Sequence, residues 1–228
     1  MTMHRSRIGQ TLAPSLAVSC WVQGEPIDLS QLLGHVVLLE VFQINCPGCF
    51  LYSLPQAVDL HYRYGGQGLV VIGIATAFED FDKNTLENLR SLIDSGRVIG
   101  ETLRMLSEHQ QLQDGRWPVR LPFPIAMDHL IPADNSVTPD LVESFIQQKL
   151  PDLTSQPIAH QNRTREQITA YLANLQYYAE TFERFALKGT PSQILIDKQG
   201  ILRYSRFGYD SELEHDIQDL LNEPASQS

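Results

Sequence analysis

Two apolar runs separated by a helical segment constrain the fold more than any other feature of this sequence. Residues 35–43 read His-Val-Val-Leu-Leu-Glu-Val-Phe-Gln, and residues 69–75 read Leu-Val-Val-Ile-Gly-Ile-Ala. Both runs are typical of strands that are buried on both faces of an α/β sheet. Between them, apolar residues recur at helical spacing from Pro47 to about Tyr64. This strand–helix–strand unit predicts two parallel strands joined by a right-handed crossover.

The remaining patterns predict an α/β fold, a mixed central β-sheet with helices on both faces. Apolar residues on both sides of Gln23-Gly24-Glu25 predict an N-terminal β-hairpin, formed by residues 17–21 and 26–29. A second hairpin around Lys198-Gln199-Gly200 joins two strands near the C-terminus. The other expected elements are a short extended segment at 121–127, the hairpin strands 192–197 and 201–206, and helices at 86–95, 101–112, 139–150, 165–187 and from about 210.

We interpret residues 8–222 as a single domain, because a chain of 228 residues suits one domain with insertions. The stretch between Thr76 and Lys188 is too long for a plain connection, so we assign residues 100–187 to a large helical insertion. A capping box, Thr164-x-x-Gln167, is expected to start its longest helix. That helix is expected to pack on the core, with a lid or a dimer surface as alternatives.

The charge balance narrows the classes of partner. Lys and Arg number 17 and Asp and Glu number 27, which gives a formal net charge of −10. Nucleic acids and anionic membranes require basic surface, so neither is expected to bind. No apolar run is long enough to span a bilayer, and no apolar signal-peptide core follows the N-terminal charges. We therefore expect a cytoplasmic protein, or a periplasmic one if a signal peptide has been removed.

Two of the three cysteines lie in the motif Cys46-Pro47-Gly48-Cys49, where the first buried strand turns into the helix. Disulfide exchange needs a thiolate nucleophile and a second thiol within reach. Because a helix N-terminus lowers a thiol pKa, Cys46 is expected to attack and Cys49 to resolve. A zinc half-site and two inert core cysteines are the alternatives. Cys20 is expected to be a small buried apolar residue or, alternatively, a regulatory disulfide partner.

Glu40 is the only charged residue in the apolar run from Val36 to Phe42. A buried carboxylate is costly unless it is partly neutral or paired. We interpret Glu40 as a group beneath the disulfide that accepts the proton of Cys49, with a pKa raised by burial. The alternative is a glutamate at the strand end that reaches solvent.

Thr190-Pro191 directly precedes the strand 192–197, a position that proline occupies mainly at strand starts. The functional interpretation is a cis-proline loop that packs against the disulfide and offers backbone groups to a substrate. Spacing alone favours the alternative, an ordinary trans turn, because cis X–Pro bonds make up only about 5–6% of cases.

Taken together, these segments resemble the thioredoxin superfamily, and within it the TlpA/ResA-like and AhpC/TSA-type redoxins. The resemblance covers residues 8–80 and 188–222 and depends on Val-Val-Leu-Leu-Glu-Val-Phe-Gln-Ile-Asn-Cys-Pro-Gly-Cys, Gly-Leu-Val-Val-Ile-Gly-Ile-Ala, Gly-Thr-Pro-Ser and Ile-Leu-Ile-Asp-Lys-Gln-Gly-Ile-Leu. It implies a thioredoxin-like fold with catalytic Cys46, Cys49, Glu40 and Pro191, and substrate contacts at Thr190, Pro47 and Gly48. The family's usual tryptophan before the first cysteine is Asn45 here.

The predicted function is a thiol–disulfide oxidoreductase that uses a redox-active disulfide and no bound cofactor or metal. Its partners would be a protein or small-molecule disulfide and an electron donor that the sequence does not identify, and a homodimer is left open. A thiol peroxidase is the alternative, although residues 39–45 lack the proline and hydroxyl of a peroxiredoxin loop. A third hypothesis is a non-enzymatic copper chaperone, with His129 as a further ligand.

Overall fold

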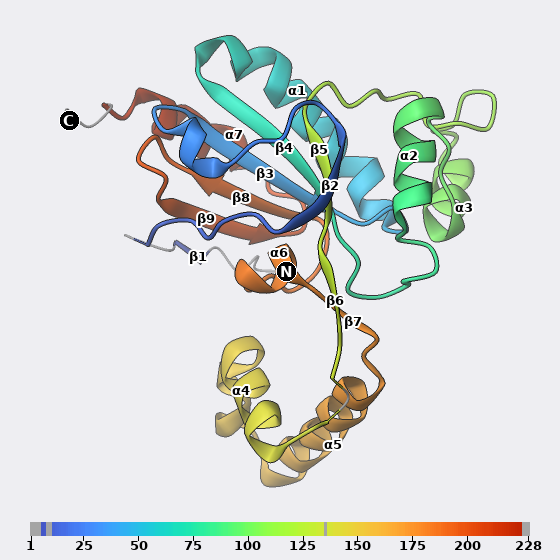
Figure 1. Cartoon of the computed structure of the whole chain (residues 1–228), viewed down its shortest axis with the longest axis vertical. Helices are drawn as coiled ribbons and strands as arrows, with labels where there is room; N and C mark the ends of the chain where they lie inside the picture. Colours follow the sequence, from blue (N-terminus) through green and yellow to red (C-terminus); the bar gives the residue numbers. More distant parts are fainter. Residues whose placement is uncertain (1–5, 8–10, 135, 225–228) are drawn as a thin grey trace.

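A seven-stranded mixed sheet forms the centre of the computed structural model, which describes residues 6–7, 11–134 and 136–224 (Figure 1). Its strand order is β1-β9-β8-β3-β4-β5-β2. Strands β3, β4 and β5 run parallel, and every other neighbouring pair is antiparallel. The strands are β1 (Ser6–Arg7), β2 (Val18–Gln23), β3 (Val36–Phe42), β4 (Leu69–Ala75), β5 (Ile125–Asp128), β8 (Ser192–Ile196) and β9 (Leu202–Phe207). The predicted mixed sheet is confirmed; residues 8–10, with which the predicted domain begins, lie outside the described residues.

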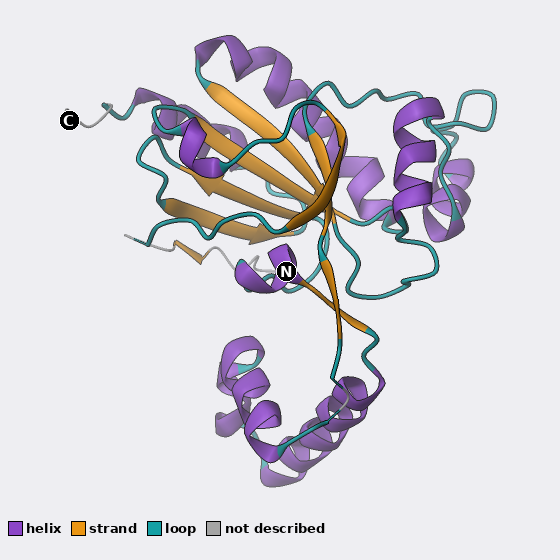
Figure 2. Ribbon diagram, viewed as in Figure 1, coloured by secondary structure: helices purple, strands orange, loops and turns teal. Residues whose placement is uncertain are grey.

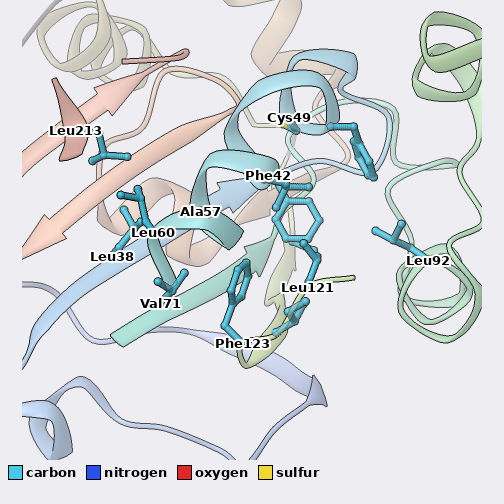
Figure 3. Packing of buried hydrophobic residues seen from close by; sticks show 14 of the residues in the cluster. Leu38, Phe42, Cys49, Ala57, Leu60, Val71, Leu92, Leu121, Phe123 and Leu213 are labelled. Atoms are coloured by element: carbon cyan, nitrogen blue, oxygen red, sulfur yellow. The ribbon is translucent and has the colours of Figure 1, made fainter. Parts of the chain in front are cut away.

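Helices cover both faces of this sheet, as the sequence predicts (Figure 2). Alternate residues of β3 enter two different cores: Val36, Leu38 and Phe42 face α1 and α7, whereas Leu39 and Val41 face α6. Figure 3 shows Cys49 near Phe42 at one end of the core beneath α1. The helices are α1 (Leu54–Tyr64), α2 (Leu86–Ser95), α3 (Gly100–Glu108), α4 (Pro139–Lys149), α5 (Ile158–Asn174), α6 (Glu180–Arg184) and α7 (Leu213–Asn222).

The helix that carries the cysteine motif is continuous from Pro47 but changes pitch at Cys49–Ser53, where one π turn precedes α1. The backbone N–H of Leu54 donates to the carbonyl of Cys49 in this turn. Pro55 follows at once and has no N–H to donate, which is the expected cause of a local irregularity in a helix. This irregularity takes the form of a π turn just after the cysteine pair.

The predicted N-terminal β-hairpin is wrong. Residues 18–23 do form β2, but β2 pairs antiparallel with β5, more than a hundred residues away, and residues 26–28 form no strand. Pro26 lacks a backbone donor for a hairpin ladder, and Asp28 instead caps a 3-10 turn, Leu29–Leu32. The local turn signal at Gly24 was therefore outweighed by the apolar partner strand β5.

The long helix predicted at 165–187 is also not formed as one element. Helix α5 begins earlier, at Ile158, so the predicted capping box lies inside it, and the chain then forms β7 (Tyr177–Ala179) and α6. The apolar positions of the pattern divide between two cores: Ile168 and Leu172 pack within the arm, whereas Phe182 packs against the sheet. The helical periodicity of the apolar residues therefore continues across a boundary between two separate hydrophobic cores.

Helices α4 and α5 form an arm that projects from the sheet on a two-stranded ribbon, as Figures 1 and 2 show. Strand β6 (Leu130–Pro132) pairs antiparallel with β7 in this ribbon. The arm has its own small buried core, formed by Val142, Ile146, Leu153, Ile168 and Leu172. None of the helices formed by residues 6–7, 11–134 and 136–224 is both long and apolar enough to cross a membrane.

Candidate active site

The cysteine pair lies at the carboxyl end of β3, where the chain turns into the helix that leads to α1. Cys46 is half-buried, Cys49 is fully buried, and both are free thiols. The backbone N–H of Cys49 donates to the carbonyl of Cys46 at 3.0 Å, which closes the first turn. An accessible thiol beside a buried thiol is the arrangement that a nucleophile and a resolving group require.

The two thiols have opposite shifts in pKa. A hydrogen bond from the Cys49 thiol lowers the pKa of Cys46 to about 7, against the opposing effect of burial, and the Gly48 and Cys49 backbone N–H groups assist. Burial raises the pKa of Cys49 well above its ordinary value, and its hydrogen bond to Cys46 adds to the shift. Near neutral pH, Cys46 is therefore the group that supplies a thiolate, while Cys49 holds its proton.

Glu40 lies in the middle of β3, on the same face as Leu38 and Phe42, and is fully buried. Burial raises the pKa of its carboxyl group to about 8, while hydrogen bonds with Ser53 and Gln193 act in the opposite direction. Repulsion between Glu40 and the two cysteines contributes to the raised pKa values, so these groups titrate as a coupled set. Glu40 is therefore buried, as predicted, and does not reach solvent.

The loop before β8 packs against the cysteine motif. The Thr190–Pro191 peptide bond is cis, as the resemblance implied, and the Cys46 thiol donates to the Thr190 carbonyl at 3.4 Å. A Cβ placed on Gly48 would lie 3.7 Å from the Pro191 ring, so the two loops are in direct contact. Pro47 and Gly48 are half-buried beside it. The structure thus brings the cis-proline loop and the cysteine motif together at the carboxyl end of β3.

Three residues before Cys46 tie the motif to neighbouring segments, and sequence analysis assigned none of them a role. Gln43 donates to the Glu79 carbonyl at 3.1 Å and accepts from the Thr190 hydroxyl at 3.0 Å. The Ile44 carbonyl accepts from the Thr102 hydroxyl at 2.7 Å, in α3. Asn45 accepts from the backbone N–H of Glu101 at 2.7 Å, so it caps α3 from outside. The active-site loop is therefore fixed from two sides.

Sequence analysis also missed Gln193, the second residue of β8, which stands between Ser192 and the apolar residues 194–196. Gln193 and Glu40 are paired in register across the antiparallel strands β8 and β3, and both are fully buried. The Gln193 side chain donates to a Glu40 carboxylate oxygen at 3.0 Å. The signal that identified Glu40, a polar residue within an apolar run, is absent at Gln193, because polar residues and a proline precede it; the pairing with Glu40 becomes visible only in the sheet register.

Exposed aromatic side chains lie beside the cis-proline loop. Tyr52, three residues after Cys49, has its ring 6.2 Å from that of Tyr209, and both are exposed. Phe207 is also exposed and lies so close to Gly189 that a Cβ there would be 2.4 Å from its ring. The backbone N–H of Gly208 donates to the Pro191 carbonyl at 2.8 Å. This aromatic rim, defined as Tyr52, Phe207 and Tyr209, therefore borders the predicted substrate-facing loop.

The side chains considered for metal binding or regulation have other surroundings. His129 is exposed and lies 2.9 Å from a Glu180 oxygen. Cys20 is partly buried in β2, opposite Met127. Within the described part of the chain, no three His, Cys, Asp or Glu side chains are grouped to hold a metal ion.

No protein-family model matches this chain. Protein DipZ of Mycobacterium tuberculosis and of Mycobacterium bovis is 35% identical over 75 residues, which is 31% of this chain and 11% of each DipZ protein. The chain therefore aligns with only about a tenth of the length of these curated relatives.

Solved structures match far more of the chain. A thioredoxin-like superfamily protein superposes with a TM-score of 0.58 at 24% identity, over 95% of this chain and 100% of that one. A thiol-disulfide isomerase from Corynebacterium glutamicum gives a TM-score of 0.55 at 25% identity, over 93% of this chain and 98% of that one. The chain has a thioredoxin-like fold, and the fold predicted from its sequence is confirmed.

Proposed function

We propose that this chain is a thiol–disulfide oxidoreductase that exchanges disulfides with polypeptide substrates through Cys46 and Cys49. One observation supports this function above all others: an accessible thiol with a lowered pKa and a buried thiol with a raised pKa lie above a fully buried carboxyl group. Groups with opposed pKa shifts in one small site are typical of acid–base chemistry rather than of packing.

In the first step, the Cys46 thiolate attacks one sulfur of a substrate disulfide. The substrate S–S bond breaks, a bond forms between Cys46 and the attacked sulfur, and the other substrate sulfur leaves as a thiolate that takes a proton from water. The substrate backbone would lie along the loop at Thr190 and Pro191, whose contact with Cys46 places it beside the reacting sulfur.

In the second step, Cys49 transfers its proton to the Glu40 carboxylate and attacks the Cys46 sulfur. The mixed disulfide breaks, the second substrate sulfur leaves as a thiolate and is protonated from water, and a Cys46–Cys49 disulfide forms. The substrate has gained two electrons, and an external dithiol returns the pair to its reduced form. The same steps in reverse would oxidise a substrate dithiol.

The aromatic rim supports a polypeptide rather than a small disulfide as the substrate. Its three exposed rings come from the π turn after the cysteine pair and from the end of β9 and the residues just after it, and Phe207 packs beside the cis-proline loop at Gly189. Exposed aromatic side chains grouped around a reactive centre are typical of surfaces that bind protein segments. The thiol-disulfide isomerase from Corynebacterium glutamicum, with its similar fold, agrees with a protein substrate.

The roles of the cysteines can be separated with serine variants and a disulfide-containing peptide reporter. Cys46→Ser is expected to abolish reporter reduction, because no nucleophile remains. Cys49→Ser is expected to accumulate a mixed disulfide on Cys46, detected as a mass adduct, because the resolving thiol is absent. Cys20→Ser is the matched control and should behave as wild type. Faster alkylation of Cys49 than of Cys46 near pH 7 would contradict the assignment.

The role of Glu40 predicts a dependence on pH. Because the pKa of Glu40 is about 8, the fraction of its basic form rises with pH through that value. Resolution of the mixed disulfide should therefore accelerate up to about pH 8, and Glu40→Gln should slow it at least about tenfold and flatten the profile. An unchanged profile in Glu40→Gln would remove Glu40 from the mechanism. Parallel measurement of hydrogen peroxide consumption distinguishes disulfide exchange from the thiol peroxidase alternative.

A further inference from the structure

Glu40 is the last member of a chain of side-chain hydrogen bonds that begins at the protein surface. The Gln193 Nε2 group donates to Glu40 Oε2 at 3.0 Å and to Gln56 Oε1 at 3.2 Å. The Gln56 Nε2 group donates in turn to the backbone carbonyl of Asp210 at 3.0 Å. The chain thus runs from the loop after β9, through α1 and β8, to the carboxyl group in β3.

The direction of each hydrogen bond in this chain follows from its outer end. A backbone carbonyl can only accept, so Gln56 must turn its NH₂ group toward Asp210 and its oxygen toward Gln193. Gln193 must then present its NH₂ group to that oxygen, and the same nitrogen lies beside Glu40. Asp210 is itself held by an ion pair with Arg206, which is buried in β9. The orientation of the Gln193 amide is therefore set from the surface inward.

An amide that can only donate to a carboxyl oxygen stabilises the ionised form of that group. We propose that Gln193, oriented by Gln56, is the positioning residue that keeps Glu40 able to accept the proton of Cys49. The inference rests on the proposed role of Glu40 as a proton acceptor. Without this donor, burial raises the pKa of Glu40 further. In a larger fraction of the molecules Glu40 is then protonated at neutral pH and cannot accept a proton.

Two polar side chains hydrogen-bond to Glu40: Ser53, at the end of the π turn before α1, and Gln193, on the neighbouring strand β8. On one side, β4 places Gly73 opposite Glu40, and on the other, β8 places Gln193 there. The titratable groups facing Glu40 are Cys46 and Cys49, at the start of the helix. Arg206 lies in register beyond Gln193, paired with Asp210 and Asp216.

A purely structural role for Gln193 would predict a fully satisfied pair. Instead, Glu40 Oε1 and Gln193 Oε1 are both buried without a hydrogen-bond partner among the residues that the structure describes. Two apolar residues would pack here at lower cost than a half-satisfied polar pair. Retaining the pair is consistent with a requirement for proton transfer at this position.

The test measures the titration of Glu40 directly in the reduced full-length protein. Carbon-13 NMR of protein labelled at glutamate Cδ reports the Glu40 midpoint, assigned by the resonance that disappears in Glu40→Gln. Gln193→Met, which keeps the side-chain length and removes the amide, should raise the midpoint by about one pH unit. Gln56→Met should raise it by less, because Gln193 then keeps its contact with Glu40 but loses its fixed orientation. Gln67→Met, an identical change at an exposed glutamine, should not move it.

The outcomes distinguish this inference from the proposed function. An unmoved Glu40 midpoint in both Gln193→Met and Gln56→Met would overturn the inference, whether or not Glu40→Gln slows exchange. A raised midpoint combined with unchanged exchange in Glu40→Gln would support the amide chain and overturn the proposed role of Glu40. If Gln193→Met does not fold, the half-buried Gln56 provides the decisive variant. In the same variants, the pH–rate profile for resolution of the mixed disulfide is expected to shift to higher pH by the same amount as the Glu40 midpoint.

Discussion

One helical segment precedes β5 in the sequence and another follows it, and among the residues that the structure describes only the first is hydrogen-bonded to the active-site loop. Two groups of helix α3 donate hydrogen bonds to this loop: the Glu101 N–H to the Asn45 side chain, and the Thr102 hydroxyl to the Ile44 carbonyl. The arm formed by α4 and α5 contacts the body elsewhere, for example where Lys149 donates to the Leu187 carbonyl at 2.9 Å. Neighbouring helical segments therefore differ in what they contact: one is hydrogen-bonded to the active-site loop, while the other forms a separate packing unit.

Gly100→Ala should break the contact between α3 and the active-site loop most severely. Gly100 has φ +54°, and a Cβ there would lie 2.2 Å from Asn45 Oδ1. Backbone strain and overpacking together should lower the free energy of unfolding by about 3 kcal/mol. Displacement of Asn45 should also disturb the hydrogen bonds to the adjacent Cys46 thiol, so the pKa of Cys46 should rise, as measured by alkylation rate against pH.

Gly115→Ala is the matched control, because Gly115 has φ +72° but nothing within 4 Å of an added Cβ. It should show the backbone cost alone, about 1 kcal/mol, and leave the pKa of Cys46 unchanged. Adding Asn45→Ala to Gly100→Ala should recover part of the stability, since the obstructing side chain is removed. If Gly100→Ala and Gly115→Ala lower the free energy of unfolding by the same amount, the contact of Gly100 with Asn45 makes no contribution to stability.

A second prediction compares how stability depends on pH in two regions: the body, meaning the central sheet with the helices that cover it, which contains buried Glu40, and the arm, which has an aliphatic core. In the folded protein the pKa of Glu40 is raised to about 8. Between its ordinary pKa and pH 8, Glu40 is therefore protonated in the folded state and ionised in the unfolded state. The stabilising contribution of Glu40 is therefore fully present below about pH 4 and is lost as pH rises toward 8. Relative to Glu40→Gln, the free energy of unfolding should fall by about 2 kcal/mol from pH 5 to pH 6.5.

Urea unfolding of wild type and Glu40→Gln at several pH values measures this difference. The aliphatic side chains of the arm core carry no charge, so hydrogen exchange in α5, corrected for its intrinsic pH dependence, should not share the trend. Parallel pH profiles for wild type and Glu40→Gln would show that Glu40 is not the group responsible.

The site was predictable because its chemistry is local in the sequence. Cys46 and Cys49 lie in one turn, and Glu40 stands out within a single apolar run, so the spacing and the apolar context were sufficient to select these residues. The cis bond at Pro191 was not derivable from spacing, and only the resemblance to a family indicated it. The contacts of Asn45 with α3 join segments more than fifty residues apart. No local pattern encodes such a contact.

The errors in the fold have a similar cause. Strand β2 was identified, but its partner was wrong, because strand pairing depends on the whole sheet and not on the nearest turn. The segment 165–187 was assigned to one helix, because Leu172 and Phe182 fit one periodicity although they belong to different cores. Periodicity indicates which residues are buried, and it does not indicate in which core they lie.

Thr102→Val should have a smaller effect than either of the previous changes. The substitution preserves shape but removes the hydroxyl that donates to the Ile44 carbonyl at 2.7 Å in a buried setting. The free energy of unfolding should fall by about 1 kcal/mol. Exchange should change less than in Gly100→Ala, since Asn45 still contacts α3. Thr154→Val, at an exposed threonine in the arm, is the control and should leave stability unchanged.

The smallest effect on the body is expected from a change in the core of the arm. Leu172 is buried among the aliphatic residues that connect α4 to α5, and this core is separate from the two cores beside the sheet. Leu172→Ala should cost the arm about 3 kcal/mol, because it leaves a cavity in a core too small to repack. Amide hydrogen exchange should therefore accelerate within α4 and α5. Protection of β3 and β4, the alkylation rate of Cys46 and the reduction of a small disulfide should all match wild type. Slower exchange chemistry in Leu172→Ala would show instead that the arm, like α3, is energetically coupled to the site, and the contrast between the two segments would have to be abandoned.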